Sequence, residues 1–296
     1  MDFSYLPTSW PEGSVPEGAP SPREFVQLVW DQGKAHHRDL PWRYVDDPYA
    51  VMVSEIMLQQ TQVKRVLGYW PRFLGQFPTV DALAAASTAD VLAAWQGLGY
   101  NRRALALKRA ADECSARNAG RLPETYEGLL ALPGVGPATA AGVMAFARCK
   151  PGSYLETNVR TVFLHVLFPE QEKVSDKVLE PLVALTCPPD HAREWYYALL
   201  DFGAHLKATV ANPSRRSASY SRQSTFEGSH RQKRAELLRI ALDCPGVGLE
   251  EAHAQLNAFE RARKREQVPQ DLFDKLVAEM TGEGFFALED GRLQPR

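Results

Sequence analysis

Apolar residues recur at helical spacing along most of the chain, and polar residues mark where the helices start. Residues 21–29 open with Ser-Pro-Arg-Glu, which has the form of a capping box with proline at the first helical position, and apolar residues follow three and four positions apart. Further starts of this kind occur at Ser87, Ser175 and Asp190. Between about 21 and 206 no segment shows the period-two alternation of a strand, so the pattern predicts an all-α fold.

The two ends of the chain have different patterns. Between 231 and 296, helix-like stretches precede short apolar segments that flank Asp290 and Gly291, a strong turn signal for a β-hairpin. Helices followed by a hairpin predict a small winged-helix-like module at 231–296. Residues 1–20 are rich in proline and glycine, and we expect a disordered tail there. A helical domain at 21–206 and a basic loop at 207–230 lie between these ends.

The composition is that of an ordinary globular protein. Among 296 residues, 34 Lys and Arg face 36 Asp and Glu, and 45% of the residues are hydrophobic, which excludes fibrous and wholly disordered proteins. The longest nearly apolar run, Ala138 to Ala147, is about half as long as a membrane-spanning helix. Residues 1–20 lack the basic-then-apolar order of a secretory signal. We therefore expect a cytoplasmic protein that does not bind membranes.

Neither the cysteines nor the histidines show the spacing of a metal site. The 4 cysteines are Cys114, Cys149, Cys187 and Cys244, so none forms a Cys-x-x-Cys pair. The 7 histidines are scattered along the chain as well. We expect no required cofactor.

Basic residues are concentrated between 207 and 234. Against a single acid, Glu227, this segment contains Lys207, Arg215, Arg216, Arg222, Arg231, Lys233 and Arg234, which gives a local charge of +6. Because the net charge of the whole chain is −2, nucleic-acid binding would have to rely on such a local patch. Composition alone fits a solvated linker and a phosphate-binding strip equally well.

A Leu-Pro-Gly-Val-Gly string at 132–136 lies between two helical stretches. Its glycines permit a tight turn that leaves backbone N–H groups at the start of the next helix, where they can hold a phosphate oxygen. The candidate contacts are Pro133, Gly134, Val135 and Gly136. The alternative is an ordinary helix connection.

An acidic residue interrupts a largely apolar stretch at 53–58. Glu55 is surrounded by apolar residues and is followed by the amides Gln59 and Gln60. Such surroundings raise the pKa of a carboxyl group, which is what a general acid near neutral pH requires. The alternative is an acid near a helix N-terminus that interacts favourably with the helix dipole.

Several ordered motifs together resemble one family. Residues 39–62 contain Asp-Leu-Pro-Trp-Arg, Asp-Pro-Tyr and Ser-Glu-Ile-Met-Leu-Gln-Gln-Thr-Gln, and Gly-Leu-Gly-Tyr at 97–100, the string at 132–136 and Asn-Val-Arg at 158–160 follow. They resemble the adenine DNA glycosylases of the MutY type, which are helix-hairpin-helix glycosylases. The likeness covers about 22–206. It implies two lobes of helices that clamp DNA, with a six-helix lobe at about 48–150, and a target base flipped between them.

The resemblance also implies roles for single residues. Glu55 would deliver a proton to the leaving base. Tyr100 and Gln59 would occupy the space that the flipped base vacates, and Gln60 would also contact DNA. The family pattern Leu-Asp-Gly-Asn-Val reads Leu-Glu-Thr-Asn-Val at 155–159, so Glu156 replaces the catalytic aspartate. We expect Glu156 to stabilise the sugar cation and Asn158 to position water or Glu156. A surface acid at a helix start is the alternative for Glu156.

The chain departs from the family at three further places. Ala138 stands where glycosylases that also nick the strand have a nucleophilic lysine, which predicts base removal without lyase activity. The cysteines of the family's [4Fe–4S] cluster are absent, and we expect Lys207, Arg215, Arg216 and Arg222 to contact the DNA backbone instead. The family's larger β-rich C-terminal domain, which reads 8-oxoguanine, is replaced by the short module. The resemblance leaves room for a monovalent cation at the hairpin carbonyls.

These observations predict a two-lobed, all-α helix-hairpin-helix glycosylase with a winged-helix-like module. We expect a monomeric, monofunctional enzyme of base excision repair that acts on double-stranded DNA, in the nucleoid if the source is bacterial. Adenine opposite guanine or 8-oxoguanine is the expected target, with hypoxanthine, uracil, thymine mismatches and alkylated bases as alternatives. A DNA-binding protein without catalysis and a bifunctional lyase are the rival interpretations.

Overall fold

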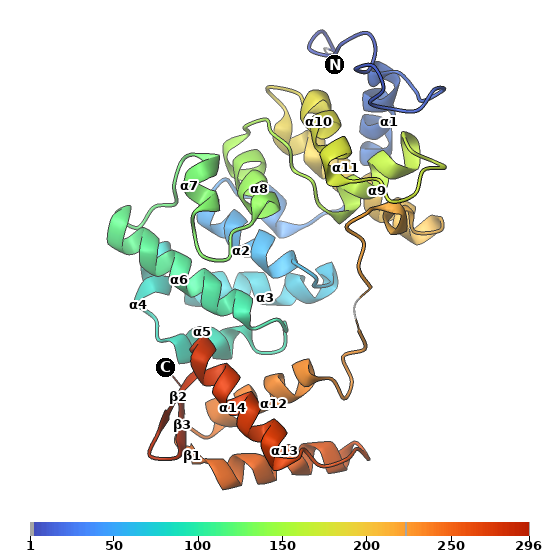
Figure 1. Cartoon of the computed structure of the whole chain (residues 1–296). Helices are drawn as coiled ribbons and strands as arrows, with labels where there is room; N and C mark the ends of the chain where they lie inside the picture. Colours follow the sequence, from blue (N-terminus) through green and yellow to red (C-terminus); the bar gives the residue numbers. More distant parts are fainter. Residues whose placement is uncertain (1–2, 223, 296) are drawn as a thin grey trace. The chain divides into compact units, whose positions relative to one another are not determined.

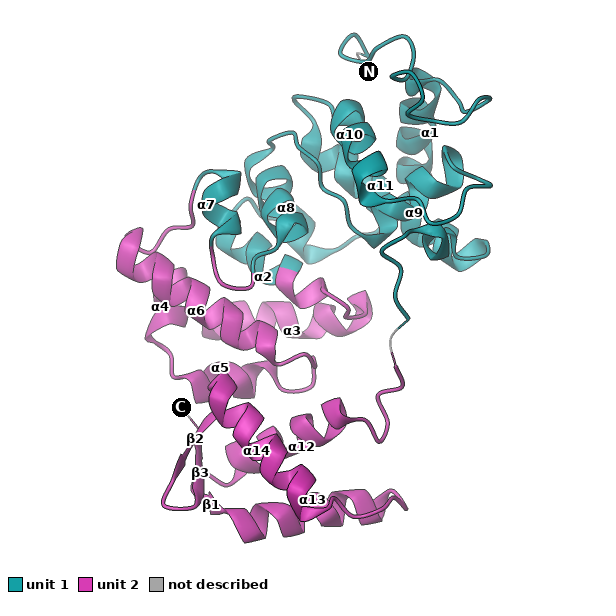
Figure 2. Cartoon of the chain, viewed as in Figure 1, with its two compact units in different colours: residues 1–55, 124–131, 135–222 teal, residues 56–123, 132–134, 223–296 magenta. Residues whose placement is uncertain are grey.

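The computed structural model describes residues 3–222 and 224–295 and confirms the all-α fold (Figure 1). The chain divides into two compact units, which Figure 2 colours separately. Residues 1–55, 124–131 and 135–222 make up unit 1, and residues 56–123, 132–134 and 223–296 make up unit 2. Helix α2 (Pro48–Leu58) begins in unit 1 and ends in unit 2. No described helix is both long and apolar enough to cross a membrane.

Unit 1 is a helical bundle built around α11. It contains α1 (Pro22–Ala35), the 3-10 turn η1 (Pro41–Tyr44), α7 (Tyr126–Leu130), α8 (Pro137–Arg148), α9 (Thr157–Val166), α10 (Asp176–Thr186), α11 (Ala192–Thr209) and the 3-10 turn η2 (Pro213–Arg216). Helix α11 packs against α1, α8 and α9. Phe25 of α1 meets Phe163 of α9 with ring centroids 4.8 Å apart, and Trp195 of α11 is fully buried. The predicted capping box at Ser21 is present.

The Leu-Pro-Trp-Arg motif has a structural role inside unit 1. The Arg43 guanidinium donates to both carboxylate oxygens of Asp201, at 2.8 and 2.7 Å, and lies 4.4 Å from the centre of the Tyr197 ring. Arg38 donates to the same carboxylate at 2.6 Å. Paired guanidinium groups stabilise this buried carboxylate, which ties η1 to α11.

The expected disordered tail is wrong for residues 3–20. The Tyr5 hydroxyl donates to the carbonyl of Thr186, and the Trp10 indole donates to the carbonyl of Pro20 at 2.7 Å. Trp10 also packs edge-on against Phe25 at 5.9 Å. Burial of aromatic surface outweighs the turn-forming composition of this segment.

Unit 2 joins four helices to the C-terminal module. The helices are α3 (Val63–Gln76), α4 (Val80–Ala85), α5 (Thr88–Trp95) and α6 (Arg102–Arg117). Helix α6 packs against α4 and α5, and Phe73 and Trp95 form the aromatic core. The lobe expected at 48–150 is therefore not one compact unit, because α7 and α8 belong with unit 1. The periodicity of a helix shows which of its faces is apolar, but it does not show against which other helices that face packs.

The C-terminal module contains α12 (His230–Asp243), β1 (Val247–Gly248), α13 (Leu249–Ala262), α14 (Gln270–Glu283), β2 (Phe286–Glu289) and β3 (Arg292–Pro295). The strands form an antiparallel sheet in the order β1-β3-β2. Asp290 and Gly291 both have positive φ, 48° and 71°, as a type I′ turn requires. The predicted hairpin is thus confirmed, and the element order is that of a winged helix.

Candidate active site

The catalytic candidate Glu55 lies on α2, and its carboxyl group meets Tyr154, in the loop between α8 and α9, and the backbone of α8. Its Oε2 atom accepts a hydrogen bond from the Tyr154 hydroxyl at 3.0 Å. Gly142 of α8 leaves room for this pair: a Cβ atom at that position would lie 2.4 Å from Glu55 Oε2 and 3.0 Å from Tyr154 Cε2. The sequence therefore places a glycine where the backbone of α8 must approach the carboxyl group.

Burial controls the proton affinity of Glu55. Loss of water raises the pKa of Glu55 to about 8, the Tyr154 hydrogen bond opposes that rise, and the charge of Glu156 adds to it. A carboxyl group with this pKa is largely protonated at neutral pH. Glu55 therefore has the property that was expected of a general acid.

Glu156 caps helix α9 at its N-terminus. Its Oε1 atom accepts from the backbone N–H groups of Asn158 and Val159, the latter at 2.9 Å, and its Oε2 atom accepts from Asn158 Nδ2 at 3.3 Å. Gly203 on α11 lets this turn come close, since a Cβ atom there would lie 2.2 Å from the carbonyl oxygen of Asn158. Glu156 is therefore fixed by backbone donors and is not a free surface acid.

Two basic side chains near Glu156 favour its charged form. Burial raises the pKa of Glu156 above its usual value, although backbone hydrogen bonds, Lys207 and Arg160 oppose that rise. The Lys207 ammonium donates to Asn158 Oδ1 at 3.2 Å, and Arg160 pairs with Asp176 at 2.7 Å. The structure thus brings Lys207 from the end of α11 to Asn158, so this lysine belongs to the candidate site as well as to the basic segment.

The hairpin at 132–136 has the local geometry of a tight turn. Gly134 has φ of +73°, and a Cβ atom there would lie 2.4 Å from the Cβ atom of Ala106. Gly136 is the N-cap of α8 and supplies no side-chain cap. Pro133 and Val135 complete the loop between α7 and α8. The N-cap residue of α8 therefore has no side chain that could bond the first N–H groups of the helix. A helix start that binds an anion needs such N–H groups.

Two of the predicted DNA-contacting residues of unit 2 lie on strained backbone. Gln60 and Tyr100 have φ of 53° and 50°, in the left-handed region that residues other than glycine rarely adopt. Arg103 fixes both loops, because its guanidinium donates to the carbonyls of Gln59 and Gly99, the latter at 3.0 Å. It also binds the carbonyl of Ile56 at 2.8 Å and thereby holds the end of α2.

The sequence interpretation missed Tyr154, Gly142 and Arg103. No motif marks Tyr154 as a partner of Glu55, because the two residues are 99 positions apart in the chain. Arg103 lies three residues after Tyr100, at the start of α6. A positive charge is unfavourable at a helix N-terminus, so its presence there could have indicated a specific partner for Arg103.

The basic segment is partly structural. Arg215 and Arg222 are exposed, in agreement with a solvent-facing strip. Arg216 instead donates to the carbonyls of Leu164, at 2.8 Å, and Pro169, and so satisfies the C-terminal end of α9. These two hydrogen bonds give Arg216 a structural role in unit 1, and its contact with the DNA backbone stays a prediction. Lys207 is helical and not part of a loop.

The four cysteines do not form the ligand set of an iron–sulfur cluster. Cys114 and Cys244 belong to unit 2, whereas Cys149 and Cys187 belong to unit 1, and all four are free thiols. Across residues 3–222 and 224–295, no three His, Cys, Asp or Glu side chains come together as metal ligands.

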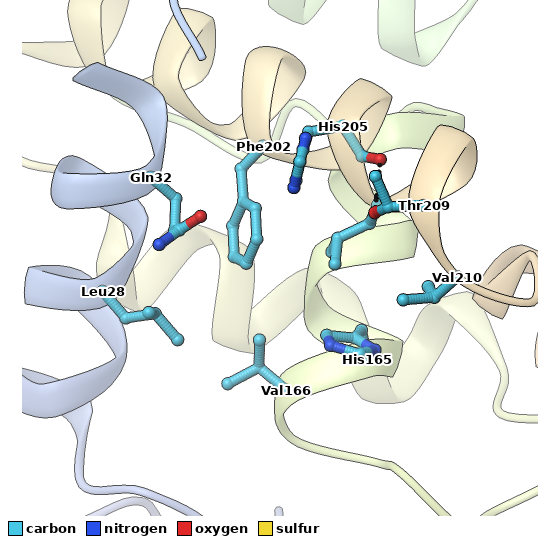
Figure 3. Close-up of a pocket in the computed structure, with 9 residues that line it drawn as sticks. Leu28, Gln32, His165, Val166, Phe202, His205, Thr209 and Val210 are labelled. Carbon is cyan, nitrogen blue, oxygen red and sulfur yellow. Dashed lines mark hydrogen bonds between the residues drawn. The ribbon is translucent and has the colours of Figure 1, made fainter. Parts of the chain in front are cut away.

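A separate cavity of about 400 Å³ lies in unit 1 among α1, α9 and α11 (Figure 3). Its wall contains five apolar residues, two histidines, a glutamine and a threonine: Leu28, Val166, Phe202, Leu206, Val210, His165, His205, Gln32 and Thr209. Neither Glu55 nor Glu156 lines it, so we assign it no part in the chemistry.

Both the sequence and the fold are similar to those of DNA repair glycosylases. Residues 53–186 match the family model described as HhH-GPD superfamily base excision DNA repair protein. The adenine DNA glycosylase of Mycobacterium tuberculosis is 33% identical over 282 residues, which cover 88% of this chain and 91% of the relative. The thymine/uracil-DNA glycosylase of Pyrobaculum aerophilum is 34% identical over 182 residues, covering 60% and 79%. A solved thermostable thymine-DNA glycosylase superposes with a TM-score of 0.56 at 26% identity, covering 62% of this chain and 86% of that one.

Proposed function

The chain belongs to the helix-hairpin-helix superfamily of base excision repair DNA glycosylases, and we propose that it hydrolyses the N-glycosidic bond of adenine mispaired with guanine or 8-oxoguanine. Membership makes the protein a DNA N-glycosylase that acts in base excision repair. The choice of adenine, the roles of single residues and the monomeric state are our proposals. Its substrate associates the enzyme with chromosomal DNA, which in a bacterial cell is the nucleoid.

One observation carries the chemical proposal: the Glu55 carboxyl accepts a hydrogen bond from the Tyr154 hydroxyl at 3.0 Å, at a place where burial raises the pKa of Glu55 to about 8. When the bond between C1′ and the purine breaks, its electron pair moves to the base. Transfer of the Glu55 proton to a ring nitrogen neutralises that charge and makes the base a better leaving group. A flipped base is required, because the bond is inaccessible in the stacked duplex.

Glu156 and Asn158 supply the second half of the reaction. Loss of the base leaves positive charge on the sugar, and a nearby carboxylate stabilises such an oxocarbenium ion. Glu156 is held by α9 so that Oε1 binds backbone N–H groups while Oε2 faces Asn158. Water then adds to C1′, and its proton passes to Glu156 or to solvent. The longer glutamate thus serves in place of the family's aspartate.

The length of the match favours adenine over thymine or uracil. The similarity to the M. tuberculosis adenine enzyme leaves only 12% of this chain uncovered, so it must include part of the C-terminal module. The similarity to the P. aerophilum enzyme covers only 60% of this chain. An adenine glycosylase of comparable length therefore supports adenine removal without the larger C-terminal domain.

We propose that base removal occurs without strand cleavage and without a cluster. Ala138, at the second position of α8, has no amine to form a Schiff base. Lys207 donates a hydrogen bond to Asn158, however, so its amine is the group that could form a Schiff base in the candidate site. Borohydride trapping should give no covalent DNA adduct; an adduct that disappears in Lys207→Ala would overturn the monofunctional assignment.

Single-turnover base release tests the proposed function. The protein in excess is incubated with duplexes that contain adenine opposite 8-oxoguanine, adenine opposite guanine, or thymine or uracil opposite guanine, and samples are developed with and without alkali. We expect alkali-dependent breaks at adenine that are lost in Glu55→Gln. Release of thymine or uracil alone would overturn the choice of base. Binding without any release would identify a protein that has kept the fold and lost catalysis.

A further inference from the structure

The C-terminal module contacts the residue that is expected to enter the duplex. Arg231 of α12 donates from Nη1 to the Tyr100 hydroxyl at 2.6 Å, and its guanidinium carbon lies 5.5 Å from the centre of the Tyr100 ring. Arg103 lies 5.4 Å from the same ring. Tyr100 is therefore held by a hydrogen bond and by two cation–π contacts while its backbone stays in the left-handed region.

Arg231 also joins Tyr100 to a second aromatic ring. Its Nη2 atom donates to the carbonyl of Ser224 at 2.7 Å, and its guanidinium carbon lies 6.0 Å from the centre of the Phe226 ring. The Phe226 side chain is 48% exposed, so its ring is open to a partner. An exposed aromatic ring beside a cation is the combination that binds unstacked nucleobases.

The module is fixed to the start of α6, the helix that follows Tyr100. Glu283, the last residue of α14, accepts from Arg102 Nε at 2.6 Å and from Arg234 Nη2 at 2.6 Å. Arg109 donates to the backbone carbonyl of Glu283 at 2.7 Å. Arg102 and Arg234 lower the pKa of Glu283, so its carboxylate stays charged. These contacts hold α12, and with it Arg231, beside Tyr100.

We propose that Tyr100, Arg231 and Phe226 form one DNA-contacting site, in which Arg231 positions Tyr100 and Phe226 stacks on the base left unpaired opposite the extruded one. The inference rests on the proposed function, because only base extrusion creates an unpaired partner. Every nucleobase offers a flat face for stacking, so this contact would support binding without reading the identity of the base.

Phe226 is tested with two duplexes that contain no base to remove. One carries a tetrahydrofuran abasic-site analogue opposite guanine, and the other carries analogues on both strands at the same position. Phe226→Ala should weaken binding of the first duplex roughly tenfold, as expected for loss of one stacked base, and leave the second nearly unchanged. Leu288→Ala, which removes an exposed apolar side chain of the C-terminal module, is the matched control.

Arg231 is tested through the Tyr100 hydroxyl. Arg231→Gln and Tyr100→Phe should each reduce the fluorescence rise of 2-aminopurine placed beside the abasic analogue, which reports unstacking. The double variant should lose no more than Arg231→Gln alone, because both changes remove the same hydrogen bond. Arg239→Gln, on the same helix but paired with Glu236 and Asp243, should match the unmodified protein.

The outcomes separate the two proposals. If the unmodified protein fails to bind either abasic duplex, the proposed function itself is wrong. If it binds both and Phe226→Ala weakens them equally or not at all, the stacking role is wrong. Additive effects of Arg231→Gln and Tyr100→Phe would overturn the positioning role of Arg231.

Discussion

Replacing Glu55 by glutamine should abolish base release and at the same time stabilise the folded protein above about pH 5. The two effects have one cause. Burial raises the pKa of Glu55 from 4.5 to about 8, so the folded chain binds this proton more tightly than the unfolded chain does. As pH rises from 4.5 towards 8, the unfolded chain releases the proton first, and the folded state loses stability. Glutamine keeps the shape and cannot ionise.

The size of the effect follows from the shifted pKa. A carboxyl group whose pKa rises from 4.5 to about 8 removes about 3 kcal/mol of stability between about pH 5 and pH 8. Glu55 retains some exposure, which lowers the cost of ionising it, and we expect about 2 kcal/mol in measurement. The Tyr154 hydroxyl can donate to the glutamine oxygen, so Glu55→Gln leaves this donor paired.

Urea unfolding of both proteins at about pH 5 and pH 8 measures the prediction. The free energies of unfolding should nearly agree at the lower pH, and Glu55→Gln should be more stable by about 2 kcal/mol at the higher one. Single-turnover release should fall in the unmodified enzyme as pH rises through about 8. Equal pH dependence of stability in the two proteins would refute the argument that Glu55 is protonated by burial.

Three further changes test neighbouring parts of the site. Tyr154→Phe removes a hydrogen bond that lowers the pKa of Glu55, so the alkaline fall in single-turnover rate should move to higher pH; a shift to lower pH would contradict this. Gly142→Ala should slow base release by at least tenfold with little change in the melting temperature, because the new methyl group displaces the Glu55 carboxyl; an unchanged rate would show that the close approach is unimportant. Replacing Arg215 and Arg222 together by alanine should reduce the slope of log affinity against log salt by about 2, measured by fluorescence anisotropy, and an unchanged slope would exclude phosphate contacts.

Local features of the fold could be predicted from the sequence because their causes are local. The capping box at Ser21 and the turn at Asp290 and Gly291 depend on residues within a few positions, and both are present. The Tyr154 partner of Glu55 and the carbonyl partners of Arg216 could not be predicted in this way. Their geometry depends on helices that are distant in sequence, and composition assigns an arginine in a basic loop to solvent or to phosphate with equal ease.

The N-terminal segment is a case in which composition predicts disorder but the structure shows ordered contacts. Residues 1–20 contain 4 prolines and 2 glycines, and the prediction of a disordered tail rested on this composition. Tyr5 and Trp10 decide the outcome, because each pairs its polar atom with a carbonyl and Trp10 adds its ring to Phe25. Two aromatic side chains in a turn-rich segment therefore deserve more weight than the segment's mean composition.

The substitution of glutamate for aspartate at Glu156 has a physical account in the capping geometry. Aspartate is a preferred N-cap residue because its short side chain reaches the second and third N–H groups of the helix, and glutamate is rarer there. Glu156 nonetheless makes both contacts through Oε1, so its additional methylene is accommodated without loss of the cap. The other oxygen, Oε2, lies 3.3 Å from Asn158 Nδ2, and Lys207 holds the opposite end of that amide at 3.2 Å. In the proposed mechanism, this cap would fix one carboxylate oxygen and leave the second beside an oriented amide, so that the position of the negative charge that faces the sugar cation would be set before the reaction begins.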